Sequence, residues 1–232
     1  MEKIPLFTLM KKAAPAEVKK EILQGLDFLG KDESGMTALI YAAMKNENPQ
    51  VIKLLITEGA DVNFRGSYGL TPLMAAGANK NPQVVEQLIR LGARINDRDV
   101  AGRTPLMFAC WNTNLEIIKV YLGAGAKVNT VEKNKITPLM FAAMGNENPK
   151  IINTLIEAGA ELNARDRNGM NAFLWAVNNN HQQEVIRTLL AAGADLKVKD
   201  KRGNTALDHM KKNGSFLNTK IYQELEKELT KN

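Results

Sequence analysis

The chain has 232 residues, of which 44% are hydrophobic and 24% are charged, as in an ordinary soluble folded protein. Its formal charge of +6 lies in the ends, with +2 in residues 1–31 and +4 in residues 197–232, so residues 32–196 are neutral. This distribution argues against a basic nucleic-acid-binding face, and no apolar run approaches the ~18 residues that a membrane span needs.

Residues 1–31 predict two short helices, 4–12 and 16–24, with Pro5 and Pro15 near their starts. The apolar stretch Ile4 to Met10 is too short for a secretion signal, and its lysines follow it rather than precede it. We therefore expect a cytoplasmic protein, or a secreted or periplasmic one if a leader has been removed.

From residue 32 onward the sequence repeats every 33 or 34 residues. The clearest copies are Thr104 to Cys110 and Thr137 to Ala143, which both begin Thr-Pro-Leu-Met-Phe-Ala. The residues that open the six copies are Thr37, Thr71, Thr104, Thr137, Asn171 and Thr205. A Gly-Ala pair ends five copies, at Gly59, Gly92, Gly125, Gly159 and Gly193. Such a regular period indicates a repeated structural unit.

Each copy predicts a helix, a turn, a second helix and a loop. An apolar run such as Leu39 to Met44 forms the first helix, and an Asn/Gly/Pro cluster such as 45–49 forms a surface turn. Pro49, Pro82 and Pro149 stand where second helices begin, and the Gly of each Gly-Ala pair stands where they end. The segment Asp166 to Gly169 then has the composition of a β-turn.

One such helix pair cannot bury its apolar face, but stacked pairs can, which predicts an all-α solenoid. The period, the Thr-Pro-Leu opening and endings such as Gly59-Ala60-Asp61-Val62-Asn63 resemble the ankyrin repeat. The resemblance implies one continuous ankyrin-repeat α-solenoid with β-turn loops and helical caps. Its expected parts are an N-terminal capping repeat 1–31, five repeats 32–65, 66–98, 99–131, 132–165 and 166–199, and a C-terminal capping repeat with a final helix, 200–232. The Asn-Pro turns are similar to those of many bacterial ankyrin-repeat proteins.

Two loops depart from this pattern. Gly66 stands where the loop otherwise opens with Asp, and Lys135 stands where a Gly is expected. We expect the neighbouring Asn134 to help the second loop, because Asn tolerates positive φ. At the C-terminus, Ile221, Leu225 and Leu229 share one face of an amphipathic stretch. We interpret this stretch as the cap of the solenoid, with a detachable partner-binding helix as the alternative.

No pattern in the sequence predicts catalysis, a metal site or a cofactor, so we expect a protein that is not an enzyme. His181 and His209 lie in different copies, and Cys110 occupies the place of an Ala, which indicates a small packing residue. The carboxylates that recur once per copy at Asp32, Asp99, Asp166 and Asp200 suit hydrogen bonds within turns. The recurring Asn63, Asn96, Asn129 and Asn163 are interpreted as ties between loops.

The resemblance implies that a partner meets the β-turn tips and the concave face of the first helices. Large apolar residues and one Arg occupy these positions, and they predict a binding stripe. The candidate residues are Met36, Met44, Tyr68, Leu70, Val100, Arg103, Trp111, Ile136, Met144 and Met170. We expect a monomeric scaffold that binds an unidentified protein or peptide. The alternatives are a regulatory or inhibitory subunit of an enzyme and, less favoured, nucleic-acid or small-ligand binding.

Overall fold

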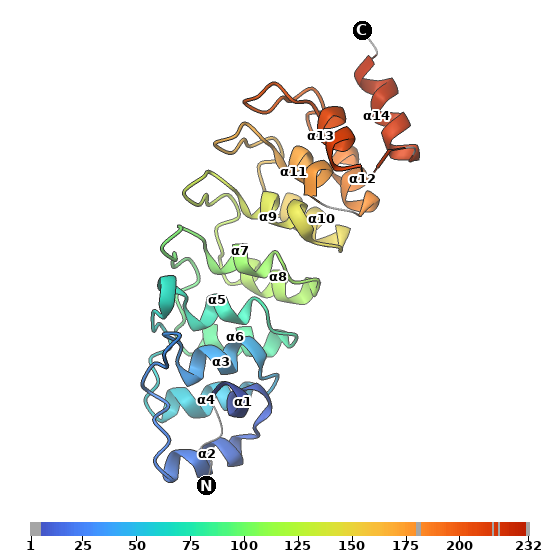
Figure 1. The fold of residues 1–232 in the computed structure, drawn as a ribbon. Helices are drawn as coiled ribbons and strands as arrows, with labels where there is room; N and C mark the ends of the chain where they lie inside the picture. Colours follow the sequence, from blue (N-terminus) through green and yellow to red (C-terminus); the bar gives the residue numbers. More distant parts are fainter. Residues whose placement is uncertain (1–5, 180–181, 215, 218, 231–232) are drawn as a thin grey trace. The chain divides into compact units, whose positions relative to one another are not determined.

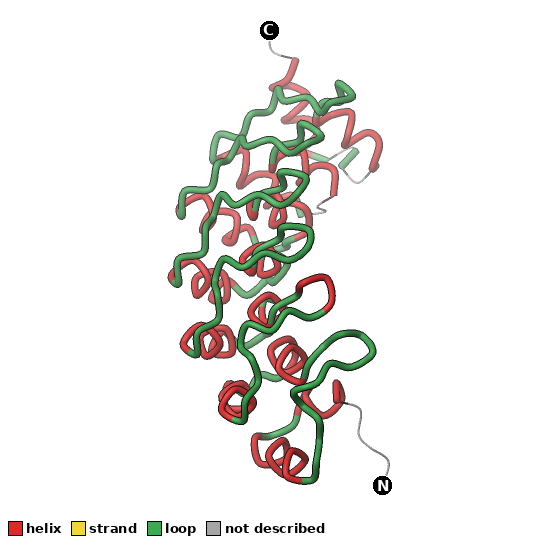
Figure 2. Tube along the Cα trace, turned by 90° about the vertical axis from the view of Figure 1, so that its left-hand side faces the viewer, coloured by secondary structure: helices red, strands yellow, loops and turns green. Residues whose placement is uncertain are grey.

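A computed structural model describes residues 6–179, 182–214, 216–217 and 219–230. In these residues, helices alternate with loops and no strand occurs, which confirms the predicted all-α fold of stacked helix-turn-helix units. The chain divides into two compact units, Met1–Lys127 (unit 1) and Val128–Asn232 (unit 2). In each unit the loops extend from one side of the helices (Figures 1 and 2).

Unit 1 contains two layers of helices. The first helices of its helix pairs are α1 (Leu6–Lys12), α3 (Ala38–Lys45), α5 (Pro72–Ala76) and α7 (Pro105–Ala109). The second helices are α2 (Pro15–Leu23), α4 (Pro49–Thr57), α6 (Pro82–Arg90) and α8 (Leu115–Gly123). Each helix packs against its counterpart in the next pair, α1 on α3 on α5 on α7 and α2 on α4 on α6 on α8 (Figure 1). A single 3₁₀ turn, η1 (Ser67–Gly69), lies in the loop before α5.

Unit 2 continues the same pattern. Its helices are α9 (Pro138–Gly145), α10 (Pro149–Glu157), α11 (Ala172–Asn179), α12 (Gln183–Ala191), α13 (Ala206–Asn213) and α14 (Lys220–Thr230). The final amphipathic stretch forms α14, which packs on α13 and buries Ile221 and Leu225. Its Glu224 Oε2 lies 2.9 Å from Arg187 Nη1 of α12. These contacts are those expected of a cap.

The side chain that opens a copy caps the first helix in five of the six copies, and the Thr104 hydroxyl is the exception. The hydroxyls of Thr71 and Thr137 each accept a hydrogen bond from a backbone N–H three residues later, at 3.2 Å. Such N-caps stabilise a helix by about 1 kcal/mol. Pro at the next position preorganises the first turn. The repeated motif is therefore scaffold, which begins each first helix at a fixed place.

The second helices bury the apolar pairs that the sequence pattern predicts. In α4, the side chains of Val51, Ile52 and Leu55 are completely buried. Their equivalents are also completely buried: Val84, Val85, Leu88, Ile117, Ile118, Tyr121, Ile151, Ile152, Leu155, Val185, Ile186 and Leu189. Within each unit, the hydrophobic effect of these buried side chains, roughly 1.5–3 kcal/mol for each large one, holds neighbouring pairs together.

Buried asparagines join the inter-helix turns of unit 1, which corrects the expectation that these turns lie wholly on the surface. Asn46 is 3% exposed, and its Nδ2 donates to the carbonyls of Met10 at 3.1 Å and Ala13 at 3.0 Å. Asn79 is 1% exposed and donates in the same way to Ala43 at 2.8 Å and Asn46 at 3.0 Å.

This asparagine ladder continues one step further, from Asn112 to the carbonyls of Gly77 and Asn79 at 2.9 and 2.6 Å. Because buried carbonyls must be paired, each Asn supplies donors that the preceding turn lacks. The ladder thereby fixes the register between the ends of successive first helices.

The second set of asparagines ties the loops together, as interpreted from the sequence. Asn63 Nδ2 donates to the Gly92 carbonyl at 3.0 Å, and its Oδ1 accepts from the Arg94 N–H at 2.9 Å. Asn96 in unit 1 and Asn129 in unit 2 make the same pair of bonds. Each Asn thus pairs a backbone carbonyl and a backbone N–H that lie just after the second helix of the following helix pair.

The loop with Lys135 differs from the expectation. Lys135 itself adopts a positive φ of 64°, where the sister loops have Gly102 and Gly169, and Asn134 does not. We expect Lys135→Gly to raise the free energy of unfolding of unit 2 by about 0.5–1 kcal/mol, because a left-handed non-Gly residue is strained. Urea denaturation of the two proteins measures this. Lys133→Gly in the same loop is the control and should give no gain; an equal gain in both variants would refute the explanation.

Candidate partner-binding surface

Every loop except the one that begins at Gly66 is closed at its base by a carboxylate. In the third loop, the Asp99 N–H donates to the Arg103 carbonyl at 3.0 Å, and Asp99 Oδ1 accepts from the Arg103 N–H at 2.7 Å. Asp99 Oδ2 accepts from Arg103 Nε, also at 2.7 Å. The base is therefore rigid, and only the residues between these two project as a tip.

Two other loops are closed in the same way, but a different side chain donates to Oδ2 of the Asp. The Tyr41 hydroxyl donates to Asp32 Oδ2 at 2.5 Å, and Trp175 Nε1 donates to Asp166 Oδ2 at 3.1 Å. These bonds confirm that the recurring carboxylates serve hydrogen bonds within the turns. They also order the loops before any partner binds.

The bonds around Asp32 give stability a pH dependence. The Tyr41 hydroxyl and then the Met36 N–H lower the pKa of Asp32, because both stabilise the charged form. A carboxyl group whose pKa is lower in the folded state than in the unfolded state stabilises the fold at pH values above its unfolded pKa of about 3.9. This stabilisation is lost as the pH falls through the pKa of the folded state. We expect Asp32→Asn to lower the Tm at pH 7 and to flatten its fall between pH 5 and 3. Calorimetry across this range tests it; parallel curves would contradict it.

The tip of the second loop is rearranged because Gly66 replaces the carboxylate. A Cβ at Gly66 would lie 2.9 Å from the Gly35 carbonyl of the preceding loop, so no Asp fits without a shift. Without the carboxylate, the Leu70 N–H donates to the Ser67 carbonyl at 3.1 Å, whereas the equivalent Arg103 N–H bonds to Asp99 Oδ1, and residues Ser67–Gly69 form η1. Tyr68 inside this turn takes a left-handed conformation, with φ 56° and ψ 16°.

This rearrangement presents Tyr68 to solvent beside the next tip. Tyr68 is 79% exposed and Val100 is 53% exposed, and the Val100 N–H donates to the Tyr68 carbonyl at 2.9 Å. Trp111, in the turn after α7, is 54% exposed. Single exposed apolar residues are common on protein surfaces, whereas neighbouring ones mark interaction sites, and Tyr68 and Val100 are such neighbours. Of the predicted stripe, these three residues of unit 1 are the well-exposed ones.

The remaining candidates of unit 1 are only partly exposed. Met36, Leu70 and Arg103 stand at loop bases, and Met44 stands near the end of α3. Arg103 is engaged within the molecule, since its guanidinium lies 4.7 Å from the centre of the Phe108 ring in addition to its bond to Asp99.

In unit 2, Ile136 and Met144 are partly exposed, whereas Met170 is 6% exposed. The Met170 N–H and carbonyl both bond to Asp166, so this residue belongs to the base of its loop and not to the tip. The structure therefore does not place Met170 on an accessible surface, contrary to the sequence expectation.

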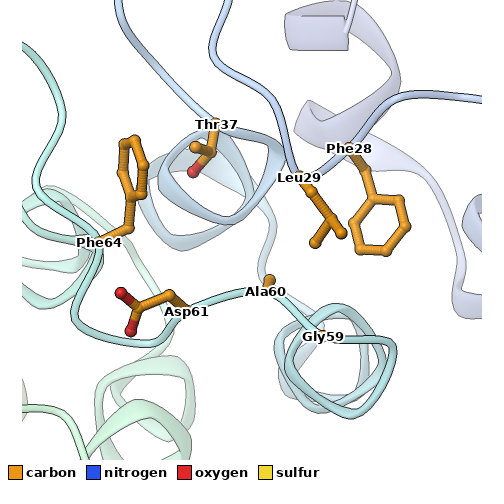
Figure 3. Close-up of a pocket in the computed structure, with 7 residues that line it drawn as sticks. All are labelled: Phe28, Leu29, Thr37, Gly59, Ala60, Asp61 and Phe64. Carbon is orange, nitrogen blue, oxygen red and sulfur yellow. The ribbon is translucent and has the colours of Figure 1, made fainter.

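The structure also shows a small hollow that the sequence did not indicate (Figure 3). Phe28 and Leu29 lie on one side, Phe64 on the other and Ala60 between them. Its volume is about 140 Å³. Small-molecule sites usually measure about 300–1,000 Å³, so this hollow is too small to act as one.

In the part of the chain that the structure describes, the cysteine and the histidine lie apart from each other and serve packing contacts and hydrogen bonds. Cys110 is fully buried, and burial raises the pKa of its thiol, as expected of a packing residue. His209 is 8% exposed, with Nδ1 at 3.0 Å from Asn178 Oδ1 and Nε2 at 3.2 Å from Asp200 Oδ2. His181 lies outside the described residues. Among the described residues, no three His, Cys, Asp or Glu side chains could hold a metal ion together, and no helix has the length and apolarity to cross a membrane.

Comparisons with known proteins agree with this architecture. A family model described as ankyrin repeats (3 copies) matches residues 9–99, 39–132, 106–200 and 139–218. The crystal structure of the human ASB11 ankyrin repeat domain is similar over 97% of both chains, with a TM-score of 0.80 and 23% identity, a likeness of fold. The putative ankyrin repeat protein FPV022 of fowlpox virus (strain NVSL) is 32% identical over 57 residues, which are 25% of this chain and 10% of that protein. The chain thus matches about a tenth of that relative's length.

Proposed function

Because the chain belongs to the ankyrin-repeat family, whose repeats are generally protein–protein interaction modules, we propose that it is a non-enzymatic scaffold that binds a partner protein or peptide. The proposed binding surface comprises Tyr68 and Val100 at two neighbouring loop tips and Trp111 in the turn after α7; these three residues are together named the apolar tip cluster of unit 1. The observation that carries the proposal is Tyr68, which is 79% exposed at a loop tip and left-handed.

The conformation of Tyr68 supports a functional role. A left-handed non-Gly residue costs about 1–2 kcal/mol, and an exposed aromatic ring does not offset that cost in the free protein. Covering the ring by a partner would contribute about 1.5–3 kcal/mol. The strain is therefore explained if the ring is buried in a complex.

The hydrogen bonds between loops make this surface ready for binding. Val100 is bonded to Tyr68, and the Ser67 hydroxyl donates to the Ser34 carbonyl at 2.7 Å, so three successive loops are linked. A preordered surface loses little conformational entropy on association. In unit 2, Met144 occupies the position equivalent to Trp111, and Ile136 stands at a loop base; both are only partly exposed, so we expect smaller contributions from them.

Quantitative affinity enrichment from a cell extract tests the proposal. The bait is compared with Tyr68→Ser/Val100→Ser, with Trp111→Ala and with the control Gln50→Ser/Gln83→Ser, whose two positions are exposed on α4 and α6. We expect the tip variants to lose specific partners at least tenfold and the control to keep them, because aromatic anchors dominate interface energies. Undiminished enrichment by folded tip variants would overturn the proposal.

The same experiment addresses the alternative of a regulatory or inhibitory subunit. An enzyme among the captured partners, with activity altered by the bait and not by the tip variant, would favour that role. A monomeric state, a cytoplasmic location and a bacterial source stay predictions from the sequence. Light scattering of the purified chain tests the first of them.

A further inference from the structure

The asparagine ladder brings the ends of three helix pairs into one row, and lysines stand in this row or beside it. Lys12, Lys45 and Ala78 directly precede the ladder positions Ala13, Asn46 and Asn79. Because the ladder aligns these positions, the side chains before them stand in consecutive layers at the ends of α1, α3 and α5. Lys11 and Lys80 lie beside this row, one in α1 and one in the turn after α5.

These residues surround a hollow of about 530 Å³ in unit 1. Four lysines line it, Lys11, Lys12, Lys45 and Lys80, all of them exposed. Met44 and Ala78 add apolar surface between them. The volume is within the range of about 300–1,000 Å³ that binding sites usually have, and it would hold a few residues of a peptide.

The charge of the hollow is strongly positive. Against the four ammonium groups stands one carboxylate, Glu47, which leaves an excess of three positive charges. No ion pair is found for any of the four lysines among the described residues. The ends of α1, α3 and α5 supply at most about half a negative charge each, so the excess persists.

We propose that this lysine-rimmed hollow, defined as Lys11, Lys12, Lys45 and Lys80 around Met44 and Ala78, binds an acidic segment of the partner protein. The carboxylates of the segment would meet the ammonium groups, and an apolar side chain within it would rest on Met44 and Ala78. The inference rests on the proposed protein-binding function and adds the chemistry of the partner.

A peptide fits the hollow better than a nucleic acid does. A phosphate backbone carries regularly spaced charges and needs a basic track of some length. The basic side chains here are confined to one hollow, and residues 32–196 as a whole are neutral. The apolar surface between the lysines also offers nothing to a phosphate.

Fluorescence anisotropy with defined probes tests the inference. The probes are a labelled peptide Asp-Glu-Leu-Asp-Asp-Leu-Glu-Glu, its Asn/Gln analogue, and a ten-nucleotide oligothymidylate. We compare the whole chain with Lys45→Glu/Lys80→Glu and with the charge-matched control Lys31→Glu/Lys53→Glu, both exposed positions outside the hollow. We expect the acidic peptide to bind, its amide analogue to bind at least tenfold more weakly, and only the hollow variant to lose at least tenfold. Circular dichroism confirms that each variant is folded.

Three results would overturn the inference: no binding of the acidic peptide by the wild-type chain, equal loss in the hollow variant and the control, or tighter binding of oligothymidylate than of the peptide. None of these results would contradict the proposed role of the tip cluster, because the effect of the Tyr68 and Val100 substitutions on partner enrichment is measured in a separate experiment. Conversely, peptide binding that persists when the tip variants keep all their partners would support the hollow and reject the tip cluster.

Discussion

Replacing Asn79 by Ala is expected to lower the free energy of unfolding of unit 1 by about 3 kcal/mol. The substitution leaves the carbonyls of Ala43 and Asn46 without their side-chain donor, at a site where Asn79 is 1% exposed. Each buried polar group left unpaired costs about 1–3 kcal/mol. The Asn81 N–H also loses its acceptor, Asn79 Oδ1, at 2.9 Å.

Urea denaturation of residues 1–232 measures this loss when it is followed by the fluorescence of Trp111 in a Trp175→Phe background, because Trp175 would otherwise report on unit 2. Asn81→Ala, two residues away, is the matched control. It removes the N-cap of α6, whose exposed bond to the Gln83 N–H contributes about 1 kcal/mol, and an exposed bond from Asn81 Nδ2 to the Glu47 carbonyl at 2.7 Å, but it leaves no buried group unpaired. Equal losses in the two variants would mean that the ladder is not a principal support of the stack.

Replacing Tyr68 by Asn is expected to weaken partner binding at least tenfold and, at the same time, to stabilise unit 1 by about 1 kcal/mol. Asn tolerates the left-handed region, so the strain at φ 56° is relieved. The exposed ring is lost, and with it the apolar area that a partner would cover. Opposite signs for stability and affinity distinguish a functional residue from a merely structural one.

Tyr68→Phe is the control for this prediction, because it keeps both the ring and the strain. We expect its stability to be unchanged and its affinity to fall by a few-fold at most. If Tyr68→Asn bound the partner as well as the wild-type chain does, the strain at this tip would need another explanation. Titration calorimetry and thermal denaturation provide the two measurements.

The sequence predicted the scaffold well because its signals are local. Pro49, Pro82 and Pro149 are the first residues of α4, α6 and α10. The predicted helix 16–24 is found as α2, Pro15–Leu23, and the final stretch 221–229 as α14, Lys220–Thr230. Proline, glycine and the apolar period act within one turn of helix, so their positions can be read without knowing the fold.

The asparagine ladder was missed because burial depends on the neighbouring pair and not on local sequence. Asn in a turn cluster is normally exposed, yet Asn46 and Asn79 are nearly inaccessible. A signal did exist: Asn-x-Asn stands at a constant three residues before the second helix, at Asn46, Asn79, Asn112 and Asn146. A turn under no constraint would not keep the same residue in each copy.

The candidate site was predicted only in part, for a related reason. The sequence shows which residues flank a turn, but the hydrogen bonds across the base of the loop decide which of them point outward. Met170 is held at such a base and is buried, whereas Tyr68 is turned outward because Gly66 lacks the usual carboxylate. That consequence follows from the closeness of two loops, which the sequence does not reveal.

The central claim is that the partner contacts the apolar tip cluster of unit 1 and not the layer of second helices. Photo-crosslinking tests it most directly, with p-benzoylphenylalanine placed at Tyr68 or, as a control, at exposed Lys53 of α4. We expect one specific crosslinked partner from position 68 and none from position 53. The same partner captured from position 53, with none from position 68, would contradict it.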